Sequence, residues 1–165
     1  MFKIIIKRQV SLKPEELSGC VKNNIMKKLE SIIKTGECSY DNGYILEIKR
    51  ILNFNNNYIS NATNMIVFTV VFEAITLNPK IGSLLNGTVV SIHTSGIFVE
   101  IKEKIKVLVS ESNMDGMIYD VNTLTYISKV RKGVVKKNDI VSIKISDIRY
   151  QNKKISCIGI LIKKI

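Results

Sequence analysis

The chain has 165 residues, which is enough for one domain or for two small ones. Hydrophobic residues make up 45% of it, enough for a packed core, so the composition excludes a wholly disordered chain. The formal net charge of +11 predicts a polyanionic partner, with nucleic acid favoured over an anionic membrane surface. The alternative that the charge serves only solubility remains open.

Cysteine and histidine are scarce. Cys20, Cys38, Cys157 and the single histidine, His93, lie far apart in the sequence, so we expect no metal site and no cofactor. We interpret the cysteines as buried or incidental thiols of a reducing compartment. The apolar run near the N-terminus is too short for a signal peptide, and no stretch has the length of a membrane span, so no membrane partner is expected.

The first part of the chain predicts a strand, a helix and a further strand. Residues 2–10 have strand character, and Ser11 is a candidate N-cap for a helix with acidic residues in its first turn. Val21, Ile25 and Leu29 recur at helical spacing, and Gly36 is predicted to end the helix. A strand is expected to start at residue 43 and to reach about residue 52.

An Asn-rich segment follows that strand. Residues 53–64 are predicted to form a turn-like loop, and residues 65–77 a long strand. The segment 78–82 contains Pro79 and Gly82 and is expected to interrupt the sheet. The sequence therefore predicts two domains, which comprise residues 1–81 and residues 82–165.

The second part has five short strand patterns. They cover residues 84–92, 97–101, 105–109, 139–148 and 155–162, and the polar segment 110–131 between the third and fourth is predicted to be irregular. Five strands with a long insertion at this place predict an all-β barrel of the OB type. Most of the excess positive charge lies in this part, which is therefore the better candidate for nucleic-acid binding.

Strand alternation predicts which side chains of the barrel face solvent. If the aliphatic residues of the second and third strands fill the core, then Phe98, Lys104, Lys106 and Leu108 lie on the outer face. An exposed aromatic ring beside lysines suits single-stranded RNA, which needs a stacking surface and positive charge. The open alternative is that Phe98 packs under the segment 110–131. A basic run that includes Lys129, Arg131 and Lys132 is either a second RNA contact or a solvated loop.

The sequence does not predict an enzyme. A catalytic His93 would need a cysteine, serine or carboxylate arranged around it, but Cys20 and Cys38 belong to the other domain and no nucleophile motif surrounds either. The glycines are too isolated for a phosphate-binding loop. The acidic residues are spread over loops and strand ends instead of forming a cluster.

Several motifs of the second part resemble the RNA-binding barrel first seen in ribosomal protein S-one. They are Gly87-x-Val89, Gly96-Ile97-Phe98-Val99, Val107-Leu108-Val109-Ser110-Glu111 and Asn138-Asp139-x-Val141. Asn138 stands where that family usually has glycine, and asparagine tolerates a left-handed backbone better than most residues do.

Motifs of both parts together resemble the stalk subunit of archaeal and eukaryotic RNA polymerases. They are Leu12-x-Pro14, Gly36, residues 43–46, residues 68–75, and the series Pro79, Gly82, Gly87 and Val89. The resemblance implies an α+β N-terminal domain that docks on the polymerase core, followed by a barrel that contacts nascent single-stranded RNA. It also implies the polymerase core subunits as partners and leaves open a small helical stalk partner. Such a subunit would reside in the nucleus or, for a large DNA virus, in the host cytoplasm or the virion.

The docking surface is expected at one tip of the first domain. The hypothesis combines the turn at Gly36 with the Asn-rich segment that contains Asn57, Tyr58 and Ile59, because an apolar pair in a polar loop often anchors an interface. Simple packing of the loop is the alternative for these side chains. The alternative for the whole protein is a free-standing RNA-binding translation or decay factor that uses the same barrel.

Overall fold

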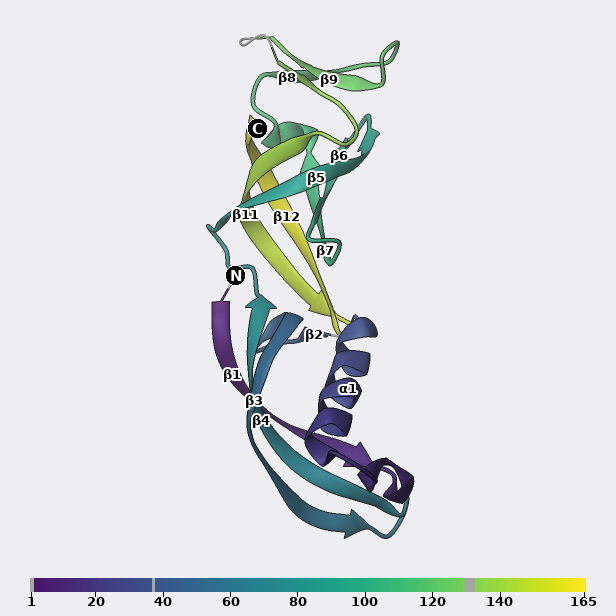
Figure 1. Cartoon of the computed structure of the whole chain (residues 1–165). Coiled ribbons are helices and arrows are strands. Elements are labelled where there is room, and N and C mark those ends of the chain that lie inside the picture. The colour runs from purple at the N-terminus through teal and green to yellow at the C-terminus, as the bar shows by residue number, and fades with distance from the viewer. Residues whose placement is uncertain (1, 37, 130–132) are drawn as a thin grey trace. The chain divides into compact units, whose positions relative to one another are not determined.

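The computed structural model describes residues 2–36, 38–129 and 133–165 (Figure 1). It divides the chain into two compact units, of which the first ends at Asn78 and the second begins at Pro79. The sequence placed this boundary between residues 81 and 82.

The first unit is built on a four-stranded antiparallel sheet. Its elements are β1 (Phe2–Leu12), the 3-10 helix η1 (Pro14–Leu17), α1 (Val21–Lys34), β2 (Cys38–Ser39), β3 (Gly43–Ser60) and β4 (Met65–Leu77), and the strand order is β1-β4-β3-β2. The prediction of an α+β docking domain is not confirmed, because the unit is mostly β with one α-helix and its docking role stays a prediction.

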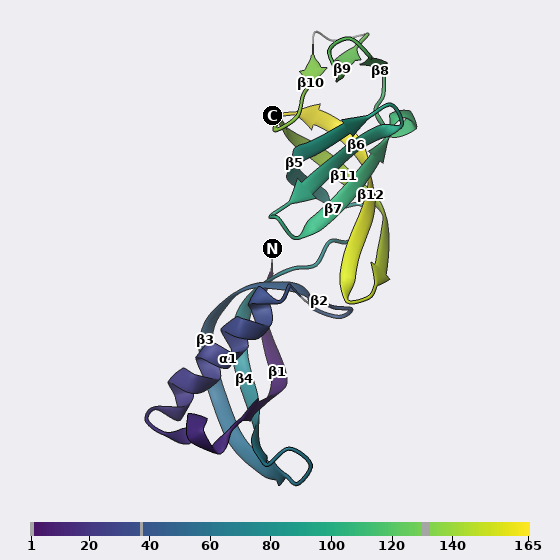
Figure 2. The same ribbon diagram turned by 90° about the vertical axis from the view of Figure 1, so that its right-hand side faces the viewer.

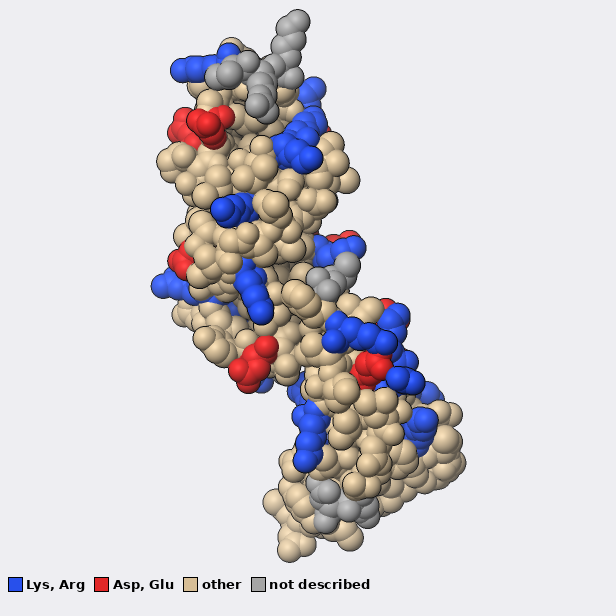
Figure 3. All heavy atoms as spheres, turned by 90° about the vertical axis from the view of Figure 1, so that its left-hand side faces the viewer, with Lys and Arg blue, Asp and Glu red and all other residues tan. Residues whose placement is uncertain are grey.

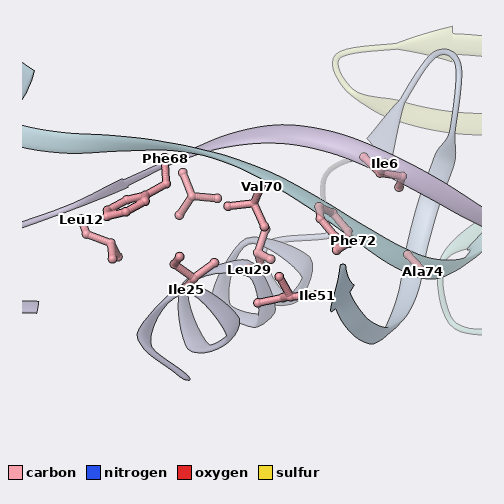
Figure 4. Close-up of a cluster of buried hydrophobic side chains, with 10 residues drawn as sticks. Ile6, Leu12, Ile25, Leu29, Ile51, Phe68, Val70, Phe72 and Ala74 are labelled. Atoms are coloured by element: carbon pink, nitrogen blue, oxygen red, sulfur yellow. The ribbon is translucent and has the colours of Figure 1, made fainter. Parts of the chain in front are cut away.

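The helix α1 covers one face of this sheet. Ile25 and Leu29 lie four residues apart on the helix and are both buried against Phe68, Val70 and Phe72 of β4 (Figure 4). The opposite face of the sheet carries the alternate residues of each strand. The cluster of buried hydrophobic residues that these side chains form therefore lies on the helix side of the sheet.

The helix begins later than the sequence predicted. Ser11 is not an N-cap, since it lies in β1, where it pairs with Val67 of β4. Burial of the next residue, Leu12, in the core extends this strand, and Pro14 then starts a 3-10 turn. The prediction for the other end is confirmed: Gly36 follows the last turn of α1 with a φ of +71°, a left-handed conformation that glycine adopts without strain.

The Asn-rich segment is mostly strand, so the prediction of a loop at residues 53–64 is wrong. The strand β3 continues to Ser60, and Tyr58 and Ile59 pair with Val67 and Ile66 of β4. Only the turn after Ser60 reverses the chain. Backbone pairing with the long apolar strand β4 outweighs the turn preference of asparagine, because tertiary context sets strand formation more strongly than local propensity does.

The second unit contains a closed five-stranded barrel, as the sequence predicted (Figure 2). Its strands are β5 (Leu84–His93), β6 (Gly96–Ile101), β7 (Ile105–Ser110), β11 (Ile140–Gln151) and β12 (Lys154–Lys164). They follow the order β11-β12-β7-β6-β5, and β5 pairs with β11. All pairs are antiparallel except β7 with β12, which are parallel.

Alternating aliphatic residues fill the barrel. Val89, Val99, Val107 and Ile143 are fully buried. At Gly87, a Cβ atom would lie 2.5 Å from Cγ1 of Val99, so only glycine allows β5 to cross the core this closely. The left-handed residue expected at Asn138 is also present, with a φ of +70°.

The segment between β7 and β11 is not irregular, so this prediction is also corrected. After the 3-10 helix η2 (Glu111–Asn113) it forms a three-stranded antiparallel sheet of order β10-β9-β8, made of β8 (Met117–Asp120), β9 (Thr125–Ser128) and β10 (Val134–Val135). We call it the inserted sheet, and Figure 2 shows it at one end of the barrel. The pair Tyr119–Tyr126, with ring centroids 5.4 Å apart, is one of the side-chain contacts that stabilise it.

Candidate nucleic-acid interface

Three apolar side chains lie side by side on the outside of the barrel. Phe98 of β6 pairs with Leu108 of β7, and Leu108 pairs with Ile158 of β12. Their sequence neighbours are core residues, so alternation turns these three outward, as the sequence predicted for Phe98 and Leu108. Phe98 and Leu108 are half-buried, and Ile158 is 41% exposed. We call this set the apolar row.

His93 extends the apolar row with a second ring. It lies at the end of β5, is exposed, and its ring centroid is 5.8 Å from that of Phe98 at an interplanar angle of 85°. This edge-to-face geometry is favourable for aromatic pairs. The sequence alone presents His93 only as a candidate catalytic residue or metal ligand. The missed signal is its position two residues after Ser91, which pairs with Phe98 and so puts both residues on one face.

The inserted sheet supports the turn next to these rings. Tyr126 is fully buried, and its hydroxyl donates to the backbone carbonyls of His93, at 2.9 Å, and Thr94, at 3.0 Å. Burial, and then the nearby Glu111 and Tyr119, raise the pKa of Tyr126, so the hydroxyl keeps its proton for these hydrogen bonds. The inserted sheet thus holds the β5–β6 turn in place, so the exposed ring of His93 stays next to the ring of Phe98.

The lysines predicted for this face occupy different positions. Lys106 is exposed on β7 and pairs with Glu100 of β6 and Ser156 of β12, in the row next to the apolar row. Lys104 is not a strand residue, since it lies in the β6–β7 turn, where its N–H donates to the carbonyl of Ile101 at 3.1 Å. Only Lys106 is therefore fixed beside the apolar row by strand pairing.

The basic run contributes one described residue. Lys129 is exposed just after β9, where its N–H donates to the carbonyl of Gly116 at 2.8 Å. Arg131 and Lys132 lie outside the described residues. On the face shown in Figure 3, basic side chains are spread along the second unit and are separated by uncharged surface. Lys129 thus belongs to the inserted sheet and not to the barrel strands that carry the apolar row.

The predicted docking residues do not form one tip. Gly36 precedes β2, which pairs with Tyr44 at the end of the sheet where Leu77 lies, whereas Tyr58 pairs with Val67 at the other end of β4. Ten strand residues separate these two ends, a distance of about 33 Å. Tyr58 and Ile59 are 52% and 62% exposed near the end of the β3–β4 hairpin. Asn57 is part of β3, and its side chain lies outside the described part of the structure.

The thiols offer little nucleophilic chemistry. Burial, and then Asp147, raise the pKa of Cys157 to about 11, and burial likewise raises the pKa of Cys38. Both therefore stay protonated near neutral pH, and a thiol is a much weaker nucleophile than a thiolate. Within residues 2–36, 38–129 and 133–165, no three His, Cys, Asp or Glu side chains are grouped so that they could hold a metal ion.

No helix in the described segments is both long enough and apolar enough to cross a bilayer.

Thiol accessibility gives a direct test of this burial. Cys20 is exposed, so it should react with a disulfide reagent in the native protein at pH 8, whereas Cys38 and Cys157 should react only after unfolding. Burial raises the pKa of Cys157 from its ordinary value of 9.0 to about 11 in the folded chain. The free energy of unfolding should therefore fall between these pH values, by at most about 1.4 kcal/mol per pH unit from this group. Cys157→Ala should flatten the pH profile, and an unchanged profile would show that the thiol is not protected.

Comparison with known proteins identifies the second unit. Residues 78–157 match the model of the S1 RNA binding domain, so a domain of this family is present in the chain. Two solved structures of RNase R from Mycoplasma genitalium are similar over part of the chain. The apo form is 22% identical with a TM-score of 0.40 over 48% of this chain, and the complex with ribose methylated single-stranded RNA is 24% identical with a TM-score of 0.41 over 50%. The match covers 13% of each RNase R chain.

Proposed function

We propose, from the S1 RNA-binding domain at residues 78–157, that this chain is a non-catalytic protein that binds single-stranded RNA on the outer face of its barrel. The observation that supports this face most strongly is the pair of adjoining rings, His93 and Phe98, at the end of the apolar row. Aromatic rings on a barrel surface offer a platform on which unpaired bases stack.

Each part of the face has a role in this proposal. Phe98 and His93 stack on bases, and Leu108 and Ile158 contact the flat sides of neighbouring bases or sugars. Lys106 neutralises a phosphate, which supplies affinity without base specificity. Because Glu100 pairs with Lys106, the net charge beside the row is small, and we expect weak binding with little sequence preference.

A salt titration of the full chain tests the proposal. A labelled single-stranded oligonucleotide should bind with an affinity that falls steeply with salt, because binding releases counterions from neutralised phosphates. An RNA duplex of the same length should bind more weakly, since its bases are already stacked and cannot reach the rings. Equal binding of both, or no effect of salt, would contradict binding on this face.

The cellular setting that we favour is a free-standing RNA-binding factor of translation or decay. The barrel supports it, because the apolar row and His93 belong to one chain and require no other subunit. A second candidate is the stalk subunit of an RNA polymerase, located in the nucleus or, for a viral enzyme, in the host cytoplasm or virion. The exposed Tyr58 and Ile59 favour this candidate, because large apolar side chains on a hairpin end often anchor an interface.

Purification from the native source separates these settings. A stalk subunit should copurify with the polymerase core subunits, and a small helical partner would appear in the same complex. A free-standing factor should elute without them. In the first case, the paired substitutions Tyr58→Ser and Ile59→Ser should detach the subunit, because buried anchors of this kind contribute about 2 kcal/mol or more each.

The control for this pair is Val121→Ser, which changes a residue that is 70% exposed in the β8–β9 turn. Both variants should unfold at the denaturant concentration of the wild type. Undiminished copurification of the Tyr58 and Ile59 variant would exclude this hairpin as the docking anchor.

A further inference from the structure

We propose that the first unit carries a second contact site for single-stranded RNA, in a groove on the face of its sheet opposite α1. This open groove of about 620 Å³ is lined by Lys7, Arg8 and Gln9 of β1, Asn53 and Asn55 of β3, and Thr69 and Val71 of β4. The site goes beyond the proposed function, which places RNA on the barrel of the other unit.

Strand pairing builds the floor of the groove from two rows. In one row Val71 lies between Lys7 and Asn53, and in the next Thr69 lies between Gln9 and Asn55. Residues of β4 with the opposite parity, such as Val70 and Phe72, form the core against α1. Alternation therefore turns both rows away from the helix, to a face of the first unit that no other element of that unit covers.

The charge around the groove is positive. The carboxylate in the adjoining row, Glu73, is only 7% exposed and forms ion pairs with Lys3 and with Arg50, the latter at 3.0 Å. Glu73 is thus neutralised by two cations. For Lys7 and Arg8, no carboxylate of the described residues lies within ion-pair distance. On the face of this unit shown in Figure 3, basic side chains outnumber acidic ones.

The lining favours nucleic acid over an apolar ligand. Of the seven residues that line the groove, only Val71 is apolar, whereas a surface that binds a protein helix or a drug-like molecule has apolar anchors. Lys7 can neutralise a phosphate on this face, whereas Arg8 pairs with the core residue Val70, so alternation turns its side chain toward the helix side. The amides of Gln9, Asn53 and Asn55 each offer both a donor and an acceptor, which base edges and ribose hydroxyls match. An open sheet face also accommodates an extended strand, and unpaired bases leave those edges free.

Stoichiometry with a short labelled oligouridine tests the site in the full chain. The wild type should bind two oligonucleotides at low salt, and the Lys7→Gln variant should bind the one in the groove more weakly. Loss of this phosphate contact should reduce the affinity of the groove about fivefold at 0.1 M salt and lower its salt slope by about 0.7. The control Lys22→Gln removes the same charge from α1, on the other face of the sheet, and should bind both oligonucleotides as the wild type does.

The barrel variant with Phe98→Ala and His93→Ala separates this proposal from the proposed function. It should lose the barrel site and keep the groove site. If it binds as the wild type does, the barrel is not an RNA site. The groove variant then tests the groove independently. If the groove variant binds like its charge-matched control, the groove is not an RNA site, and a polar protein contact becomes the better use of this face.

Crosslinking of the unmodified protein gives a readout that does not depend on variants folding. Single-stranded RNA that contains 4-thiouridine should crosslink to peptides that include Lys7–Gln9 or Asn53–Asn55, in addition to barrel peptides. Crosslinks confined to residues 79–165 would overturn the proposal.

Discussion

Replacing Tyr126 by alanine should destabilise the second unit by about 3–5 kcal/mol, the cost of removing a fully buried aromatic side chain. The side chain packs against Tyr119 and is bonded to the β5–β6 turn, so its loss leaves a cavity and frees that turn. Urea unfolding of the full chain, followed by a spectroscopic signal from the barrel, measures the effect.

A conservative change separates packing from hydrogen bonding. Tyr126→Phe keeps the ring and removes only the hydroxyl, which donates to the carbonyls of His93 and Thr94. This variant should lower the free energy of unfolding by about 1 kcal/mol. Since the backbone of His93 is then held less firmly, this variant should also bind single-stranded RNA more weakly than the wild type. Wild-type stability of the alanine variant would show that the inserted sheet is not anchored through this residue.

The joint replacement of Phe98 and His93 by alanine should produce the largest loss of RNA affinity on the barrel. Each base stack that is lost is worth about 1–3 kcal/mol, which is roughly a five- to 150-fold change in the dissociation constant. Stacking involves no counterions, so the salt slope of the remaining barrel binding should not change. Lys106→Gln removes a phosphate contact instead, so it should lower that slope by about 0.7 for a single-stranded ligand.

Tyr40→Ala is a matched control for the aromatic changes. Tyr40 is 76% exposed on the first unit, between β2 and β3, and is not part of either proposed site. Its replacement should leave RNA affinity within error of the wild type. If the Phe98 and His93 variant has the same affinity as this control, RNA does not stack on the barrel face, and the barrel is better explained as a protein-binding module.

The sequence was a good guide to the barrel. Its strands alternate aliphatic core residues with outward-facing residues, as in Ile105 and Val107 around the exposed Lys106, and such alternation is a local signal. Asn138 also followed its local preference and adopted the left-handed backbone that the glycine position of the family requires. The outward direction of Phe98 and Leu108 could be predicted for the same reason.

The errors share a different origin. Asn53 and Asn55 have turn propensity, yet they lie in a strand because β4 pairs with them over the whole length of the hairpin. The segment 110–131 is polar on average, and the pairing of its residues 117–128 into a sheet depends on the contact between Tyr119 and Tyr126. His93 joins the site only through the register of β5 with β6. Cross-strand register depends on residues that are far apart in the sequence, so the residues of one strand alone do not reveal it.

The parallel pairing of β7 with β12 has a consequence for synthesis of the chain. Ser156 pairs with Lys106, so the barrel closes only when two segments about 50 residues apart meet. The first unit contains all of its strands by Leu77 and can fold while the ribosome is still translating the barrel. Until Lys154–Lys164 has emerged, β7 and β11 expose unpaired edges to solvent. During that interval the nascent chain should be a better substrate for chaperones than the finished protein is.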